Sequence, residues 1–168
     1  YQPVVNLTYL LERHFFGLNA SVFHATNLLL HLLNCLLVFY LVFLWDRNVF
    51  VALIAALLFG LHPLRVESVA WISERKDVLY SFFFLWALAD YCRYIKDNSS
   101  RYYYSALFLF LLSLGSKAMA VTLPLVLFAV DYLYNRKFDK KLILEKVPFF
   151  ALAFIFGLIA VFVQGKTL

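Results

Sequence analysis

A run of 24 residues, Val22 to Trp45, contains no Asp, Glu, Lys or Arg. As an α-helix this run would extend about 36 Å, which is enough to cross the hydrocarbon core of a bilayer. The chain as a whole is 64% hydrophobic and 20% aromatic, a composition that excludes an ordinary soluble domain of 168 residues. The sequence therefore predicts an all-α fold, a polytopic transmembrane helical bundle.

Other apolar runs extend this prediction to about six spans in one transmembrane domain. The spans are expected near residues 22–45, 49–61, 78–94, 102–114, 118–134 and 147–165. Before them, leucines recur at helical spacing within residues 1–21 and predict an amphipathic helix at the membrane interface, ended by Gly17-Leu18-Asn19. The fourth and fifth spans are short, and form either a tight hairpin, which we favour, or a re-entrant pair. Because the chain starts at Tyr1 and not at Met, we expect a fragment of the domain of a longer protein.

Basic residues are distributed unevenly between the two sets of alternate loops. One set holds nine: Arg47, Arg93, Lys96, Arg101, Arg136, Lys137, Lys140, Lys141 and Lys146. The other holds six: Arg13, Arg65, Arg75, Lys76, Lys117 and Lys166. The richer set should be cytoplasmic. The net charge of +5 then reflects loops beside anionic lipid headgroups, so the membrane is an expected partner and nucleic acid is not.

The loop from His62 to Asp77 is the densest cluster of ionisable residues, and the charge bias predicts that it faces away from the cytoplasm. Arg75 and Lys76 in this loop could neutralise a phosphate, or could simply flank a span. Lys117 lies between two short apolar runs, where an ammonium group either binds an anion or extends to the headgroups. These three residues are the candidates for binding a lipid phosphate.

Acid–base candidates lie in the same loop. Glu67 could act as a base or orient one, or could pair with a neighbouring Arg. His62 precedes Pro63 and could carry protons or bind phosphate, or could only end a helix. Asp77 is interpreted as the N-cap of the following span.

A polar stripe runs along the first span, because His24, Asn27, His31 and Asn34 are spaced 3, 4 and 3 residues apart. We favour interhelical hydrogen bonding for this stripe, with His24 and Asn27 as candidates to line a pocket. Two histidines about 10 Å apart along a helix cannot chelate one metal ion directly. The sequence thus identifies no metal ligands and no certain cofactor, and leaves a divalent metal open.

Several motifs together resemble one family. They are Leu61-His62-Pro63-Leu64-Arg65-Val66-Glu67-Ser68-Val69-Ala70-Trp71, Glu74-Arg75-Lys76-Asp77-Val78-Leu79, Tyr1-Gln2-Pro3, Phe16-Gly17-Leu18-Asn19, Asn27-Leu28-Leu29-Leu30-His31, Gly115-Ser116-Lys117 and Val121-Thr122-Leu123-Pro124. The chain resembles the membrane domain of bacterial tetratricopeptide-repeat glycosyltransferase-like proteins, which are related to the transmembrane and tetratricopeptide-repeat-containing O-mannosyltransferases.

The resemblance implies part of a type C glycosyltransferase fold. It also implies a polyprenyl-phosphate sugar as donor and a reaction on the non-cytoplasmic face. The acidic motif typical of such enzymes is expected upstream of Tyr1, and the tetratricopeptide repeats downstream of Leu168.

The predicted function is therefore an integral membrane glycosyltransferase that moves a sugar from a polyprenyl-phosphate donor to a hydroxyl of a protein or glycan acceptor. The expected location is the bacterial inner membrane with the site facing the periplasm, or the endoplasmic reticulum lumen in a eukaryote. One alternative is a non-catalytic membrane scaffold carrying tetratricopeptide repeats. The other is a transporter of lipid-linked saccharides or solutes, which should contain a second, similar half.

Overall fold

In the computed structural model, residues 2–165 are described, with side chains up to Val163; Tyr1 and Lys166, used above, lie outside this range. All the regular structure within this range is helical, which confirms the all-α prediction. The elements are α1 (Pro3–Phe16), α2 (Ala20–Asp46), α3 (Val49–Leu61), α4 (Leu64–Ala70), the 3₁₀ turn η1 (Ile72–Glu74), α5 (Arg75–Asp97), α6 (Ser100–Ser116), the 3₁₀ turn η2 (Ala118–Thr122), α7 (Leu123–Leu133) and α8 (Lys140–Gly165).

One glycine and two asparagines set the boundaries of the first three helices. Gly17 adopts φ +67°, a conformation that glycine accepts without strain, and it ends α1 where the sequence predicted. The side chain of Asn19 accepts a hydrogen bond from the Ser21 amide at the start of α2. The side chain of Asn48 accepts from the Phe50 and Val51 amides at the start of α3. These caps satisfy amide groups that have no partner within the helix.

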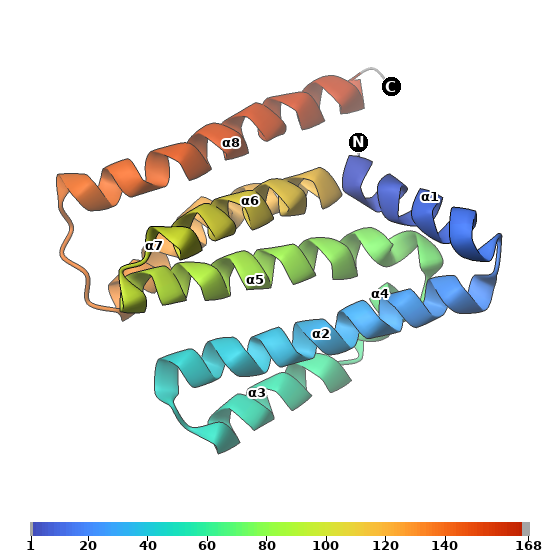
Figure 1. Ribbon diagram of the computed structural model, residues 1–168, viewed down its shortest axis with the longest axis horizontal. Helices are drawn as coiled ribbons and strands as arrows, with labels where there is room; N and C mark the ends of the chain where they lie inside the picture. The colour runs from blue at the N-terminus through green and yellow to red at the C-terminus, as the bar shows by residue number, and fades with distance from the viewer. Residues whose placement is uncertain (1, 166–168) are drawn as a thin grey trace.

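The helices form a layered bundle with α5 near its middle (Figure 1). On one side α5 packs against α6, and on the other against α2, which in turn packs against α3. α8 lies beyond α6 and η2, at the edge of the bundle. The core contains Leu41 and Leu44 of α2, small residues of α5 such as Ala87, and Phe110 and Phe149 of α6 and α8.

Two helices, α2 and α8, are long and apolar enough to cross a membrane. The pair α3 and α4 adds a third span if it is counted as one, although it bends by 64° at His62–Pro63. α6 has 17 residues, or about 26 Å, which is shorter than a typical hydrocarbon core. By length and apolar composition, the helices thus fit an integral membrane protein with two or three spans. The count of six spans remains a prediction.

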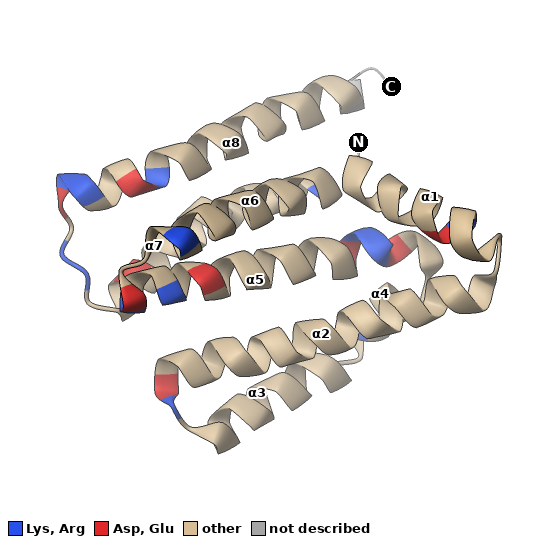
Figure 2. Ribbon diagram, viewed as in Figure 1, with Lys and Arg blue, Asp and Glu red and all other residues tan. Residues whose placement is uncertain are grey.

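Charged residues gather at the two ends of the helices, and the middle of the bundle is almost free of them (Figure 2). One end holds the turn after α2, the end of α5 and the start of α8; the other holds the start of α5 and the end of α1. Such a central band is what a bilayer requires, because unpaired charge within hydrocarbon is costly.

The chain reverses after α6, at Lys117, whose extended backbone interrupts the helix. The following α7 runs back toward the same end as the start of α6 (Figure 1), a reversal that the predicted hairpin and the re-entrant alternative share. Gly115 lies against α1 just before the reversal. A Cβ atom at Gly115 would lie 2.7 Å from Cγ2 of Val4, a separation too short for any side chain. The missing side chain therefore lets α1 approach α6.

Candidate functional site

Arg75, the first residue of α5, is fully buried and contacts two other helices, α1 and α2. Its Nη1 lies 2.6 Å from Oε2 of Glu12 in α1. Its Nε donates to Oδ1 of Asn27 at 2.9 Å, and its Nη2 donates to the carbonyl oxygen of Phe23 at 2.8 Å. The guanidinium also lies 4.7 Å from the ring centroid of Tyr9. Arg75 thus joins α1, α2 and α5, and its charge is neutralised inside the protein.

These contacts bear on the phosphate-binding role predicted for Arg75. The guanidinium could reach a ligand only by leaving Glu12, and separating a buried ion pair costs several kcal/mol. Burial also raises the pKa of the neighbouring Tyr9, while the positive charge of Arg75 opposes that rise. The geometry favours Arg75 as a residue that positions the start of α5.

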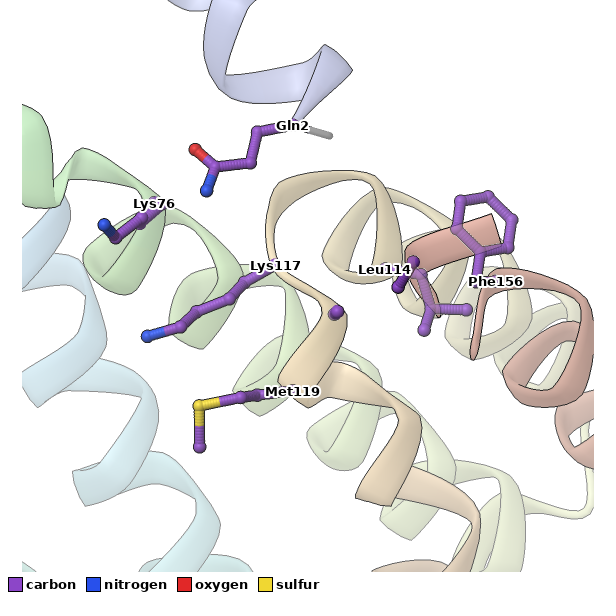
Figure 3. A pocket seen from close by; sticks show the side chains of 8 residues that line it. Gln2, Lys76, Leu114, Lys117, Met119 and Phe156 are labelled. Atoms are coloured by element: carbon purple, nitrogen blue, oxygen red, sulfur yellow. The ribbon is translucent and has the colours of Figure 1, made fainter. Parts of the chain in front are cut away.

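Lys76 and Lys117, the other two candidates, line one cavity of about 290 Å³. Figure 3 shows Gln2, Lys76 and Lys117 on one side of this cavity and Leu114 and Phe156 on the other. The lining comes from the start of α1, from α5, α6 and η2, and from α8. We call it the Lys76–Lys117 pocket. Two ammonium groups beside an apolar wall could hold an anionic group that is attached to a lipid.

Each lysine of this pocket is paired with a carboxylate at the start of α5. Lys76 Nζ lies 3.0 Å from Oε1 of Glu74, and Lys117 Nζ forms an ion pair with Oδ1 of Asp77. All four side chains are between 21% and 28% exposed, so solvent and ligands can reach them. Each carboxylate can hold its ammonium group in place and compete with an arriving anion.

The N-cap role predicted for Asp77 is wrong. The turn η1 leads directly into α5, so the helix begins at Arg75 and Glu74 occupies the N-cap position. Asp77 is the third residue of the helix and points its carboxylate at Lys117. An acidic side chain in the first turn still interacts favourably with the helix dipole.

The polar stripe of α2 mostly makes hydrogen bonds between helices, as we favoured. Asn27 Nδ2 donates to the carbonyl oxygen of Trp71 at 3.1 Å, and Asn34 Nδ2 donates to that of Val78 at 2.9 Å. His31 Nε2 lies 3.1 Å from the carbonyl oxygen of Gly60. Asn27, His31 and Asn34 are buried, and their bonds hold α3, Trp71 and the first turn of α5 against α2.

His24, the remaining member of the stripe, is exposed. It does not line the Lys76–Lys117 pocket, and neither does Asn27. The pocket-lining role predicted for these two residues therefore has no support from this pocket.

The two acid–base candidates lie in the segment around α4. His62 follows α3, and its Nδ1 accepts a hydrogen bond from the Leu64 amide at 3.2 Å, so it helps start α4. Glu67 lies on α4 with an exposed side chain. Neither residue lines the Lys76–Lys117 pocket. Nearby, Arg65 lies 4.4 Å from the ring centroid of Phe59 and not against Glu67.

A buried ionic cluster joins α5, α7 and α8 at the opposite end of the bundle. Asp131 and Lys146 are buried and lie 2.5 Å apart, and the Tyr91 hydroxyl donates to Asp131. Arg136 pairs with both Asp131 and Glu145, each at 2.9 Å. Burial lowers the pKa of Arg136, but its hydrogen bonds to the two carboxylates outweigh burial and leave the pKa raised.

The sequence analysis counted Lys146 among the loop cations, whereas the structure places it in α8 against Asp131. A signal was available, because Lys146 is followed at once by the apolar run of α8. Among residues 2–163, no three His, Cys, Asp or Glu side chains converge as a metal site would require.

Comparison with known proteins finds relatives that are named protein O-mannosyl-transferases. It is 38% identical over 102 residues to human protein O-mannosyl-transferase TMTC1, an alignment covering 58% of this chain and 11% of the relative. It is 31% identical to human protein O-mannosyl-transferase TMTC4 over 168 aligned positions, covering 88% of this chain and 23% of the relative. The chain is related to the TMTC protein O-mannosyl-transferases. This relation confirms the predicted resemblance to the transmembrane and tetratricopeptide-repeat-containing O-mannosyltransferases, whereas the bacterial origin stays a prediction.

Human protein O-mannosyl-transferase TMTC2 is another TMTC relative, 36% identical over 105 residues that cover 61% of this chain and 12% of the relative. The chain thus spans only between 11% and 23% of the length of these three TMTC proteins. No family model and no solved structure matches the chain.

Proposed function

We propose that the chain is part of an integral membrane glycosyltransferase that moves a sugar from a polyprenyl-phosphate donor to an acceptor hydroxyl. The relation to proteins named O-mannosyl-transferases supports transfer of a sugar, and it favours a protein as the acceptor. The apolar α2 and α8 support a membrane location, where a polyprenyl donor would also reside.

The observation that carries the proposal is the convergence of Lys76 and Lys117 on one pocket with an apolar wall. The two ammonium groups would bind the donor phosphate, and Leu114 and Phe156 would contact its first prenyl units. When the acceptor oxygen attacks the anomeric carbon, the bond between that carbon and the phosphate oxygen breaks. Negative charge then grows on the departing lipid phosphate, and nearby ammonium groups stabilise it most in the transition state.

The acceptor hydroxyl must lose its proton during this reaction, and a carboxylate is the expected base. We expect that carboxylate upstream of Tyr1, with Glu67 and His62 as assisting residues on the exposed segment around α4. Arg75 would position Lys76 and not contact the donor itself, because its contacts with Glu12 and Asn27 fix the first turn of α5.

The proposed topology has six spans within a type C glycosyltransferase fold. The residues from His62 to Asp77 and Lys117 would then lie on the non-cytoplasmic face, because the opposite loops carry nine of the 15 basic residues. That face is the periplasm if the chain is in the bacterial inner membrane, and the endoplasmic reticulum lumen in a eukaryote.

The decisive experiment measures donor-dependent sugar transfer by the full-length protein. Charge-assisted hydrogen bonds contribute about 1.5–3 kcal/mol each, so Lys117→Ala should lower donor binding or turnover by roughly 10- to 150-fold. Lys76→Ala should have a similar effect, and Lys117→Arg should retain part of the activity. Lys140→Ala is the matched control, since Lys140 is exposed at the opposite end of the bundle. Wild-type rates for all the pocket variants, in folded and inserted protein, would favour the scaffold alternative.

A further inference from the structure

A second hollow lies between α1, the start of α2 and η1, and it shares no residue with the Lys76–Lys117 pocket. Its volume is about 670 Å³, within the range of about 300–1,000 Å³ typical of sites for small ligands. We call it the α1–α2 groove. Its lining is Tyr9, Leu10, Arg13, Leu18, Ala20, Phe23, Ile72 and Ser73.

The wall of the groove is held in place by the contacts of Arg75. The rings of Tyr9 and Phe23 lie 5.8 Å apart, and the Arg75 guanidinium lies 4.7 Å and 5.6 Å from their centroids. The Tyr9 hydroxyl also donates to the carbonyl oxygen of Ile72 on the facing wall. The groove is therefore built by fixed side chains from three elements, which suits a specific occupant.

The groove lies beside an exposed apolar surface. α1 and the turn that follows it expose large apolar side chains to the surroundings: Leu7, Leu10, Leu11, Phe15, Phe16 and Leu18. A helix with such a face lies in the interface between headgroups and acyl chains. A lipid could enter the groove from that layer without crossing water.

The charge at the groove is positive. Glu12 is neutralised by Arg75, whereas the adjacent Arg13 is exposed and makes no ion pair with any residue between 2 and 163. A guanidinium presents paired donors that match the oxygens of a phosphate. Arg13 therefore offers a headgroup contact at the edge of an apolar hollow.

We propose that the α1–α2 groove binds an anionic phospholipid, with an acyl chain in the hollow and the headgroup phosphate on Arg13. This lipid is distinct from the sugar donor, and it would hold α1 against the membrane surface. The proposal does not depend on the Lys76–Lys117 pocket or on sugar transfer.

Photo-crosslinking in nanodiscs would test this site. The full-length protein is reconstituted in phosphatidylcholine with a trace of phosphatidylglycerol that carries a diazirine on its acyl chain, and labelled peptides are mapped. Labels should concentrate on the segments around Tyr9, Ala20 and Ile72. Ala20→Trp and Ser73→Trp place a ring in the groove from opposite walls at exposed positions and should each abolish this labelling.

The headgroup contact is tested with Arg13→Gln, which should lower labelling roughly fivefold, because one basic residue contributes modestly to binding an anionic lipid surface. Arg101→Gln, at an exposed position on α6, is the matched control and should change nothing. A phosphatidylcholine probe that labels wild-type protein equally well would overturn the proposal. So would a lack of labels at the groove, since another part of the full-length protein would then cover it, or labels unchanged by both Trp variants.

Discussion

Arg75 Nη1 and Glu12 Oε2 lie 2.6 Å apart, so a fully buried guanidinium at the start of α5 is neutralised by a carboxylate from α1. Glu12 is itself only 12% exposed. The pair connects the interfacial helix to the loop that carries the candidate phosphate ligands. The position of Lys76 thus depends on a residue far away in the sequence.

Removing the carboxylate of this pair should destabilise the protein. We expect Glu12→Gln to lower the free energy of unfolding by about 3 kcal/mol, because a buried charge loses its partner. Thermal unfolding of the full-length protein in detergent measures this loss, with Glu67→Gln on the exposed surface of α4 as the control. Equal stability of the two variants would show that the Glu12–Arg75 pair does not hold α1 in place.

Asp77 should compete with the donor for Lys117. Asp77→Asn frees the ammonium group from a partly exposed ion pair worth up to about 1 kcal/mol, so KM for the donor should fall by up to roughly fivefold. Steady-state kinetics of the full-length protein gives this value, and Asp97→Asn at the exposed end of α5 serves as the control. A rise in KM would mean instead that Asp77 holds Lys117 in its binding position.

The proposed topology predicts opposite accessibility at two exposed serines. A cysteine at Ser73 should react with an impermeant reagent in intact cells or spheroplasts, while one at Ser100 should react only after lysis. The wild-type protein controls for Cys35 and Cys92, which are half-buried and buried. The reverse pattern would refute both the topology and the proposed face of the site.

Loss of one charge should destabilise the protein more in the cluster around Asp131 than in the Glu12–Arg75 pair. Asp131→Asn removes the negative charge that pairs with the buried Lys146, so we expect a loss of about 3–5 kcal/mol in the free energy of unfolding. Lys146→Met should cost less, since Arg136 still neutralises Asp131. Chemical or thermal unfolding of both variants ranks them, and a larger loss for Lys146→Met would contradict this account.

Sequence alone predicted the features that depend on local pattern. The absence of charge from Val22 to Trp45 predicted α2 to within two residues, and the spacing of Asn27, His31 and Asn34 predicted a face that packs against other helices. Both follow from helical periodicity, which a single segment contains in full. The shared pocket of Lys76 and Lys117 could only be suggested, because they lie in different elements.

The features that sequence missed depend on partners far apart in the chain. The pairing of Arg75 with Glu12 was not predicted, because Glu12 lies in α1, far from Arg75 in the sequence. A basic residue before a span looks the same in the sequence whether it binds phosphate, flanks the span or forms a buried ion pair. Lys146 was counted as a loop cation, although α8 begins before it and buries it against Asp131. Tertiary packing decides whether such a charge is free.

The contact between Gly115 and Val4 implies a rule for covariation among homologues. Since a Cβ at Gly115 would lie 2.7 Å from Cγ2 of Val4, the sizes of these two residues are coupled through the spacing of α1 and α6. Homologues that keep this spacing should show an inverse relation: a larger residue at one position should accompany a smaller one at the other. Gln2, directly before α1, borders the Lys76–Lys117 pocket, so the opening of this pocket would then keep its width as the sequences diverge.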